Sequence, residues 1–172
     1  GPIHILTDGE IHWDIRKGVK LALALLPGTQ EEKEAAANKV EDFFRQRIKA
    51  ILLDEGVDYD IVDAVLAGAI DDVYAIFLKA HSMMDSHVKG ELEMRQAVTR
   101  LVNITKGKTA VEIRPELFTE EAEKNLYAAL EKAGEEVTNA YNAYDYGSAL
   151  PALKTLTVPI NQFLDSVMVM VE

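Results

Sequence analysis

The sequence predicts an all-α protein built as an antiparallel helical bundle. Turn residues divide the 172-residue chain into segments of helical length. Within these segments apolar residues recur every three or four positions, which is the period of one helix face, and no segment shows the strict alternation of a strand. Short loops between consecutive helices favour antiparallel neighbours. No period of about 20 to 50 residues repeats clearly, although short paired segments near the C-terminal end leave a solenoid as an alternative.

Caps and helix breakers set the limits of the first four helices. Gly28, which follows Pro27, ends the first. Thr29 is placed to cap the second, since acidic residues follow it at the positive end of the helix dipole. Asp58 is placed to cap the third. These signals predict helices over residues 13–26, 30–54, 59–67 and 71–86.

An irregular connection separates the fifth helix from those that follow. Gly107 opens this connection, and the residue before Pro115 is pushed out of the helical region, so we expect an extended segment there. Acidic residues after Thr119 suit the first turn of the next helix. Pro159 is a good first helical residue because its missing N–H needs no intrahelical partner. The expected helices cover residues 91–106, 119–132, 135–144 and 148–156, and the last begins at Pro159.

The composition excludes several classes of protein. The longest apolar run is far shorter than the roughly 18 to 20 residues that span a bilayer, which excludes a membrane protein. The chain has no Cys, so a disulfide framework, a thiolate metal site and a cysteine nucleophile are excluded, and a reducing cytoplasm suits it. The net charge of −11 opposes nucleic-acid binding in general, so RNA binding requires a local cationic face.

Residue patterns for catalysis are missing from the sequence. The four histidines, His4, His12, His81 and His87, are not spaced to share a metal ion with a third ligand. No glycine-rich phosphate loop occurs, and paired acids lie at expected helix starts, where they offset the helix dipole. We therefore expect neither a catalytic residue nor a metal site in this chain.

One face of the expected helix 91–106 has a composition suited to RNA. It carries three cations, two amides and no acid. A solvated surface is the plain interpretation of this face; contact of its cations with phosphates and of its amides with base edges is the functional one. The apolar stripe expected on the opposite side consists of Met94, Ala97, Val98, Leu101 and Thr105. The face consists of Arg95, Gln96, Thr99, Arg100, Asn103 and Lys106. The candidate RNA-binding residues are Arg95, Thr99, Arg100, Asn103 and Lys106 on this face, with Lys108 in the segment that follows.

Arg47 is a further candidate. The expected helix 30–54 has an apolar side that includes Phe43 and Ile48, and Arg47 falls among these residues. A buried guanidinium must be paired. The sequence leaves two roles open: a structural salt bridge to Asp60 or Asp63, or presentation of the guanidinium to an RNA phosphate or base.

Several short blocks follow one another in a distinctive order. They are FFRQRIK at 43–49, EG at 55–56, YDIVDAVLA at 59–67, RLVNI at 100–104, LF at 117–118, AEKNLY at 122–127 and VPINQFLDSVMVM at 158–170. The first three blocks resemble the body of the β subunit of bacterial glycyl-tRNA synthetase. The others are similar to the anticodon-binding domain and the closing signature of the same family.

The resemblance implies a helical anticodon-binding domain related to that of arginyl-tRNA synthetase. It implies that the chain recognises the anticodon loop of tRNA(Gly), and that the parent enzyme attaches glycine to this tRNA with ATP. The aminoacylation site, with its ATP and magnesium, belongs to the family's α subunit, so we expect no catalytic site and no cofactor in this chain. The implied partners are the tRNA and the α subunit, and the implied compartment is the cytoplasm. The resemblance implies binding to neither DNA nor a membrane. Arg100 and Asn103 carry over as residues of the matched motif.

The chain is expected to divide into three parts. Residues 1–2 are typical of the remnant of a removed tag. Residues 3–56 are expected to form leading helices that link to an upstream domain, and residues 57–172 the anticodon-binding domain; a single domain is the alternative division.

A competing function is an acidic helical module that serves subunit assembly without direct RNA contact. Sensitivity of binding to salt separates the two functions, because phosphate contacts release counterions and apolar docking does not. The third hypothesis is a metal-dependent hydrolase. It requires metal ligands that the sequence does not offer.

Overall fold

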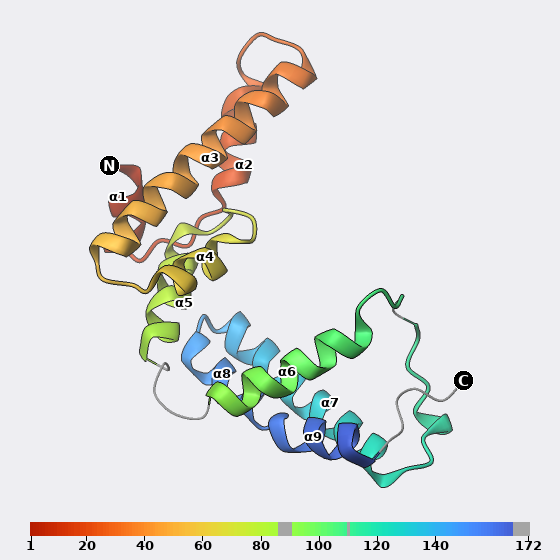
Figure 1. Ribbon diagram of the computed structural model, residues 1–172. Coiled ribbons are helices and arrows are strands. Elements are labelled where there is room, and N and C mark those ends of the chain that lie inside the picture. Colours follow the sequence, from red (N-terminus) through yellow and green to blue (C-terminus); the bar gives the residue numbers. More distant parts are fainter. Residues whose placement is uncertain (86–90, 110, 167–172) are drawn as a thin grey trace. The chain divides into compact units, whose positions relative to one another are not determined.

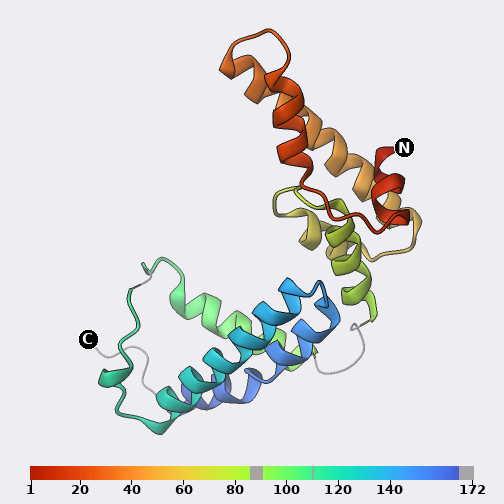
Figure 2. The ribbon, with the colours of Figure 1, turned by 180° about the vertical axis from the view of Figure 1, so that it is seen from behind.

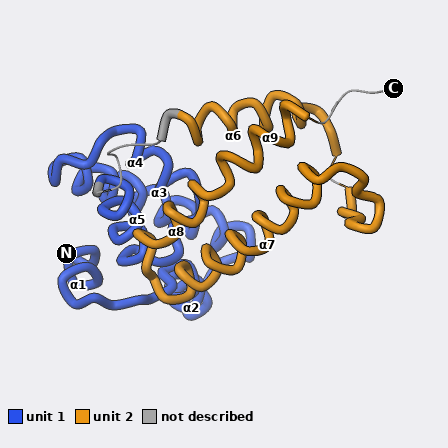
Figure 3. Tube along the Cα trace, turned by 90° about the horizontal axis from the view of Figure 1, so that it is seen from below, with its two compact units in different colours: residues 1–85 blue, residues 86–172 orange. Residues whose placement is uncertain are grey.

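Helices make up the architecture of this protein (Figure 1). The computed structural model describes residues 1–85, 91–109 and 111–166. This described part contains α-helices and one 3-10 turn but no β-strand, which confirms the predicted all-α class, and none of its helices is long and apolar enough to cross a bilayer. The chain divides into two compact units, residues 1–85 and 86–172, which have different colours in Figure 3. They are called unit 1 and unit 2 below.

Unit 1 is built around the long helix α3. This helix (Gln30–Asp54) lies beside α2 (Ile15–Ala24) in both views of the ribbon (Figure 1 and Figure 2). It also packs against α4 (Tyr59–Leu66) and α5 (Val73–Asp85), while α1 (Pro2–Asp8) packs against α5. The largest fully buried side chains come from α3, α4 and the region where α5 begins: Ile48, Leu52, Ile61, Val62, Ile70 and Val73.

Side chains cap the N-terminal ends of α2 and α3. Thr29 Oγ1 accepts a hydrogen bond from the Glu32 N–H at 3.2 Å, and the Glu32 carboxylate accepts one from the Thr29 N–H at 2.8 Å. This reciprocal pair confirms the predicted cap and satisfies N–H groups that a helix start leaves unpaired. Asp14 caps α2 by accepting from the Lys17 N–H at 2.9 Å, a hydrogen bond that lowers the pKa of the Asp14 carboxyl. Asp58 occupies the N-cap position of α4, but its side chain does not cap that helix, so this predicted role is wrong.

The helix α1 is an addition to the prediction, which placed no helix before residue 13. Pro2 is its first residue, where the fixed backbone angle of proline suits a helix start. Ile3 is buried and joins the core of unit 1. One buried side chain in a helix of seven residues produces no periodic signal, which explains why the apolar pattern did not indicate it.

Unit 2 is built around α7 (Glu121–Asn142). This helix packs against α8 (Tyr146–Lys154) and α9 (Thr157–Ser166), and α9 packs against α6 (Glu91–Thr105). The 3-10 turn η1 (Pro115–Leu117) lies in the connection between α6 and α7. The small core of unit 2 holds Ala97, Ala133, Leu156 and Ile160.

Two boundaries in unit 2 correct the prediction. The helices expected over 119–132 and 135–144 are one helix, α7, which runs through Gly134. A glycine weakens a helix interior by only about 1 kcal/mol, and burial of Ala133 and Ala140 on one side of α7 offsets that cost. The last helix begins at Thr157, so Pro159 is its third residue. Proline is tolerated there because the first four N–H groups of a helix have no intrahelical partner.

The structure groups α4 and α5 with α3. The two compact units separate after Asp85, and both of these helices pack within unit 1. The predicted boundary lies between residues 56 and 57. The division into leading helices and an anticodon-binding domain stays a prediction.

Trp13, the one tryptophan of the chain, packs over Gly18 in α2. A Cβ atom at Gly18 would lie 2.2 Å from ring atoms of Trp13, so Gly18→Ala must displace the indole. The ring is already 50% exposed and can move outward. We expect the fluorescence emission of the folded Gly18→Ala chain to shift to longer wavelength. Gly134→Ala, which adds its Cβ to open space, is the matched control and should leave the emission unchanged; an unshifted Gly18→Ala spectrum would contradict this packing.

Candidate nucleic-acid interface

The helix α6 turns a small apolar face towards α9. Ala97 is 1% exposed, and Leu101 and Ile104 are half-buried. Leu101 packs against the same core as Ala97. The predicted stripe is wrong at Val98, which is 42% exposed, and at Thr105, which is also exposed. The packed side of α6 is therefore rotated away from these two residues and towards Ile104.

The opposite side of α6 carries the predicted cations. Arg95, Thr99, Asn103 and Lys106 are exposed there, and Lys108 is exposed just beyond the helix; these five residues are called the α6 face. Within the described ranges, no hydrogen bond or ion pair engages the side chains of the face other than that of Thr99. The Thr99 hydroxyl donates to the Arg95 carbonyl at 2.7 Å. The α6 face thus offers an amide and three cations, which have no neutralising partner in the described part of the chain, to RNA phosphates and base edges.

Gly107 ends α6 and sets the position of its last cations. Its φ of +76° lies in the left-handed region, which glycine adopts without strain at a helix C-terminus. Lys106 and Lys108 flank it and lie at the negative end of the helix dipole, which they partly offset. The connection that follows exposes apolar side chains that periodicity could not indicate, Val111, Ile113 and Leu117.

Arg100 does not belong to the free part of this surface. Its guanidinium donates to Asn161 Oδ1 at 2.9 Å and to Asp165 Oδ1 at 2.7 Å, both on α9. The side chains of Arg100 and Asp165 are 45% and 67% exposed, so this ion pair is a surface interaction. The geometry indicates that Arg100 ties α6 to α9, a role that the sequence analysis did not consider.

The pairing of Arg100 provides a test of its predicted RNA contact. Asp165→Asn removes the opposing carboxylate and leaves the guanidinium with a neutral partner. If Arg100 contacts a phosphate, this change should tighten RNA binding by about fourfold at about 0.15 M salt, the value of one added phosphate contact on a single strand. RNA titration of the Asp165→Asn chain measures this, with Asp145→Asn in the same unit as a control for net charge. Unchanged affinity would leave Arg100 with its structural role alone.

Arg47 is exposed on unit 1, which corrects its predicted burial. No ion pair joins it to Asp60 or Asp63 in the described part of the chain, so the predicted salt bridge is wrong. Asp63 pairs instead with Lys49, at 2.8 Å between Oδ1 and Nζ. The second predicted role of Arg47, contact with RNA, stays a prediction.

Arg45 is the guanidinium that α3 places against the protein. It donates to the backbone carbonyl of Leu66 and, at 3.1 Å, to that of Gly68, and it pairs with Glu41 at 3.2 Å. These contacts close the C-terminal end of α4, where helix carbonyls lack intrahelical partners. Phe43, predicted on the apolar side of α3, is 57% exposed. The buried side of α3 is thus centred nearer to Ile48 and Leu52 than the sequence analysis placed it.

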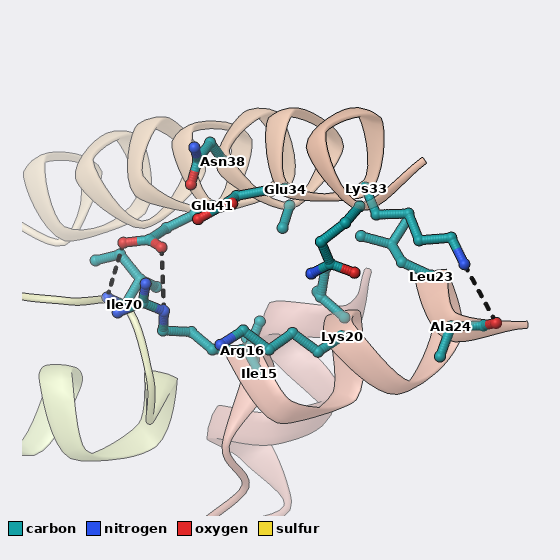
Figure 4. A pocket seen from close by; sticks show the side chains of 13 residues that line it. Ile15, Arg16, Lys20, Leu23, Ala24, Lys33, Glu34, Asn38, Glu41 and Ile70 are labelled. Atoms are coloured by element: carbon teal, nitrogen blue, oxygen red, sulfur yellow. Dashed lines mark hydrogen bonds and ion pairs between the residues drawn. The ribbon is translucent and has the colours of Figure 1, made fainter. Parts of the chain in front are cut away.

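A cleft of about 380 Å³ lies between α2 and α3 (Figure 4). Three of the polar side chains that line it have partners within the protein: Arg16, Lys33 and Glu41. The Glu41 carboxylate pairs with Arg16 at 3.3 Å and accepts a hydrogen bond from the Ile70 N–H at 3.4 Å. Lys33 donates to the Ala24 carbonyl at 3.4 Å. These contacts hold α2 against α3, and we assign no ligand to the cleft.

Metal binding finds no support in the described ranges, since no three His, Asp or Glu side chains come together there in a way that could hold an ion. His12 and His81 each face one carboxylate, Asp72 at 2.8 Å and Glu55 at 3.1 Å. His87 lies outside the described residues. The α6 face is a candidate site in the described part of unit 2.

Comparison with known proteins identifies the region that contains this face. Residues 94–172 match the family described as the DALR anticodon binding domain. The α6 face lies within this match, whereas Arg47 precedes it.

The whole chain is similar to part of the glycine--tRNA ligase beta subunits of several bacteria. It is 34% identical over 180 residues to that of Halalkalibacterium halodurans, covering 100% of this chain and 26% of the relative. The subunit of Desulforudis audaxviator is 34% identical over 176 residues, with 100% and 25% covered. That of Bacillus subtilis is 32% identical over 149 residues, with 86% and 22% covered. The chain thus spans about a quarter of the length of these relatives.

Proposed function

Because residues 94–172 of this chain belong to the DALR anticodon-binding domain family, and the whole chain is related to part of glycine--tRNA ligase β subunits, we propose that it recognises the anticodon loop of tRNA(Gly). In this proposal the parent enzyme attaches glycine to the tRNA with ATP in the cytoplasm. The α subunit of the parent assembly supplies the aminoacylation site with its ATP and magnesium. The chain itself contributes recognition and no catalytic group.

The observation that carries the proposal is the α6 face. Its cations, Arg95, Lys106 and Lys108, are exposed without a partner among the described residues and lie inside the matched range. In the proposed complex they contact phosphates of the anticodon loop, which positions the RNA without reading it. The Asn103 amide can both donate to and accept from a base edge, so it is the group suited to reading sequence. The Thr99 hydroxyl is hydrogen-bonded to a backbone carbonyl of α6.

The net charge of −11 affects how the affinity for RNA depends on distance and on salt concentration. An acidic protein repels RNA at long range, and a few local cations attract it at short range. Each phosphate contact on a single strand lowers the logarithm of affinity by about 0.7 for every tenfold rise in salt. Affinity through the α6 face is therefore expected to fall steeply as salt rises.

Fluorescence anisotropy tests the proposed function. The chain is titrated into a labelled glycine anticodon stem-loop, and into a matched stem-loop with changed anticodon bases, at several salt concentrations. Binding that weakens with salt and with the base changes supports the proposal. Equal affinity for the two stem-loops, or no binding to either, would contradict anticodon recognition by this chain.

The assembly function is supported by a different observation, the apolar side chains that α2 exposes. Leu21 and Leu25, one turn apart, are 71% and 87% exposed, and Leu26 follows them. A helix that is apolar on several sides is usually covered by a partner. This surface lies on unit 1, outside the anticodon-binding match, so contact with another part of the parent enzyme there is compatible with RNA recognition by the α6 face.

A further inference from the structure

Two cations and an aromatic ring form a row on the solvent side of α3. Lys39, Phe43 and Arg47 are spaced four residues apart, so they lie one above the other along the helix, and Gln46, three residues after Phe43, neighbours Phe43 on the helix surface. These four residues are called the α3 row. All four are exposed, and Phe43 makes an edge contact with the ring of Phe44, at 6.0 Å between centroids. The row thus presents a largely uncovered phenyl ring between two positive charges.

The cations of the α3 row have no partner in the described part of the chain. No hydrogen bond or ion pair there engages the side chains of Lys39, Gln46 or Arg47. The other cations in the same half of the helix are engaged. Arg45 binds the end of α4, and the hydrogen bonds of Lys49 to Asp63 and Tyr59 raise the pKa of its ammonium group. The helix therefore separates structural cations on its packed side from unneutralised ones on its outer side.

The charge of the surroundings makes these free cations unusual. Residues 1–85 contain 9 Lys and Arg against 16 Asp and Glu. Acidic side chains are therefore plentiful in unit 1, yet Lys39 and Arg47 pair with none of those that the structure describes. Asp42, three residues after Lys39 on α3, forms no ion pair with either cation among the described residues, and Glu41 is paired with Arg45 instead.

The chemistry of the row fits nucleic acid better than protein. The core of a protein interface is depleted of Lys, although Phe and Arg are enriched there, so Lys39 is the member of the row that disfavours such a core. Single-stranded nucleic acid is bound by aromatic rings that stack on bases and by cations that contact the adjoining phosphates. Lys39 and Arg47 are eight residues apart, about 12 Å along the helix axis, with Phe43 midway. The two phosphates that flank one nucleotide lie closer together than this, and the long side chains of Lys39 and Arg47 can converge on them from either side of Phe43.

We propose that the α3 row is a second RNA-binding surface, on which Phe43 stacks against an unpaired base of the tRNA while Lys39 and Arg47 contact the phosphates on either side. The inference rests on the proposed function, because it takes the tRNA as the ligand. It extends that function to a tRNA segment outside the anticodon stem-loop, since the row lies outside the anticodon-binding match at 94–172. Gln46 offers an amide to the edge of the stacked base.

The test compares two RNAs, the complete tRNA(Gly) transcript and the isolated glycine anticodon stem-loop. Two variants of the 172-residue chain disrupt the row: the double variant Lys39→Gln with Arg47→Gln, and Phe43→Leu. Phe43→Tyr keeps the ring and serves as the rescue variant. A double variant that removes two cations elsewhere, Lys20→Gln with Lys132→Gln, controls for net charge. Thermal unfolding of each variant confirms that these exposed substitutions leave the fold intact.

The expected result is a loss confined to the complete tRNA. Removing both cations should weaken tRNA binding by roughly tenfold at about 0.15 M salt and reduce the salt slope by about 1.4, the value of two phosphate contacts on a single strand. Phe43→Leu should weaken it by about fivefold or more through lost stacking, and Phe43→Tyr should not. Binding of the isolated stem-loop should be unchanged in every case.

Any other outcome contradicts the proposal, and the pattern of losses shows whether the second surface alone or the proposed function as well has failed. Unchanged tRNA affinity in the α3 variants, with stem-loop binding by the chain intact, would overturn the second surface and leave the proposed function standing. Equal losses on tRNA and stem-loop would overturn the assignment to a segment outside the stem-loop. If the unmodified chain bound neither RNA, the proposed function would be overturned and this inference with it.

Discussion

Replacing Arg95, Lys106 and Lys108 together with Gln is expected to weaken binding of a glycine anticodon stem-loop by about 50-fold at about 0.15 M salt. The three side chains are exposed, and no partner within the described residues holds them, so their charges are available to phosphates. Each phosphate contact on a single strand contributes a factor of about 4 at this salt concentration, and the factors multiply. The slope of log affinity against log salt should fall by about 2. Fluorescence anisotropy over a salt series measures both quantities.

A matched control separates the α6 face from the net charge of the chain. Replacing Lys20, Lys124 and Lys132 with Gln also removes three cations, and these residues lie on α2 and α7. Lys124 and Lys132 are paired with Glu121 and Glu136 on their own helix, so they have partners that the α6 cations lack. The control should change affinity by no more than the general effect of charge. Equal losses in the two triple variants would contradict a localised interface.

Leu52→Ala is expected to destabilise unit 1 by about 2 to 5 kcal/mol, the range for truncating a large buried aliphatic residue. Leu52 is fully buried and belongs to the core that joins α3 to α4 and α5. Truncation removes its apolar contacts and leaves a cavity that close-packed neighbours fill only in part. Denaturant unfolding followed by the emission of Trp13, which lies in unit 1, reports on this unit separately from unit 2.

Leu25→Ala provides the same chemical change at an exposed position. The Leu25 side chain is 87% exposed, so its loss should alter the free energy of unfolding by no more than about 0.5 kcal/mol. A large effect at Leu25, or a small one at Leu52, would contradict the packing of α2 and α3 described here. In the intact parent enzyme, an effect of Leu25→Ala on assembly would support a partner that covers α2.

Much of the local structure could be predicted from neighbouring residues. The cap at Thr29 depends on Glu32, three positions away, and both were present in one short segment. The exposed cations of α6 follow from the helical period, because polar residues recur on the side opposite Ala97, and such a side usually faces solvent. The anticodon-binding family was indicated by ordered blocks within residues 100–170 and is confirmed by the match over 94–172.

Side chains near the edge of a helix face could not be assigned in this way. Adjacent residues on a helix differ by about 100° in direction, so a modest rotation exchanges an inner position for an outer one. On α3 this rotation places Arg45 against the end of α4 and leaves Phe43 and Arg47 in solvent. On α6 it places Ile104 inside and Val98 outside.

Local spacing and ordered motifs are enough to predict the helical class, most helix limits, the cationic character of α6 and the likeness of residues 94–172 to the anticodon-binding domain. Which cations have a partner depends on the packing of the helices. Arg100 has its partner at Asp165, 65 positions along the chain, and Lys49 has its partner on the next helix, at Asp63. An ion pair forms only when two side chains lie within hydrogen-bond distance. For residues on different helices this distance depends on how the helices pack, and a local sequence pattern does not indicate that packing.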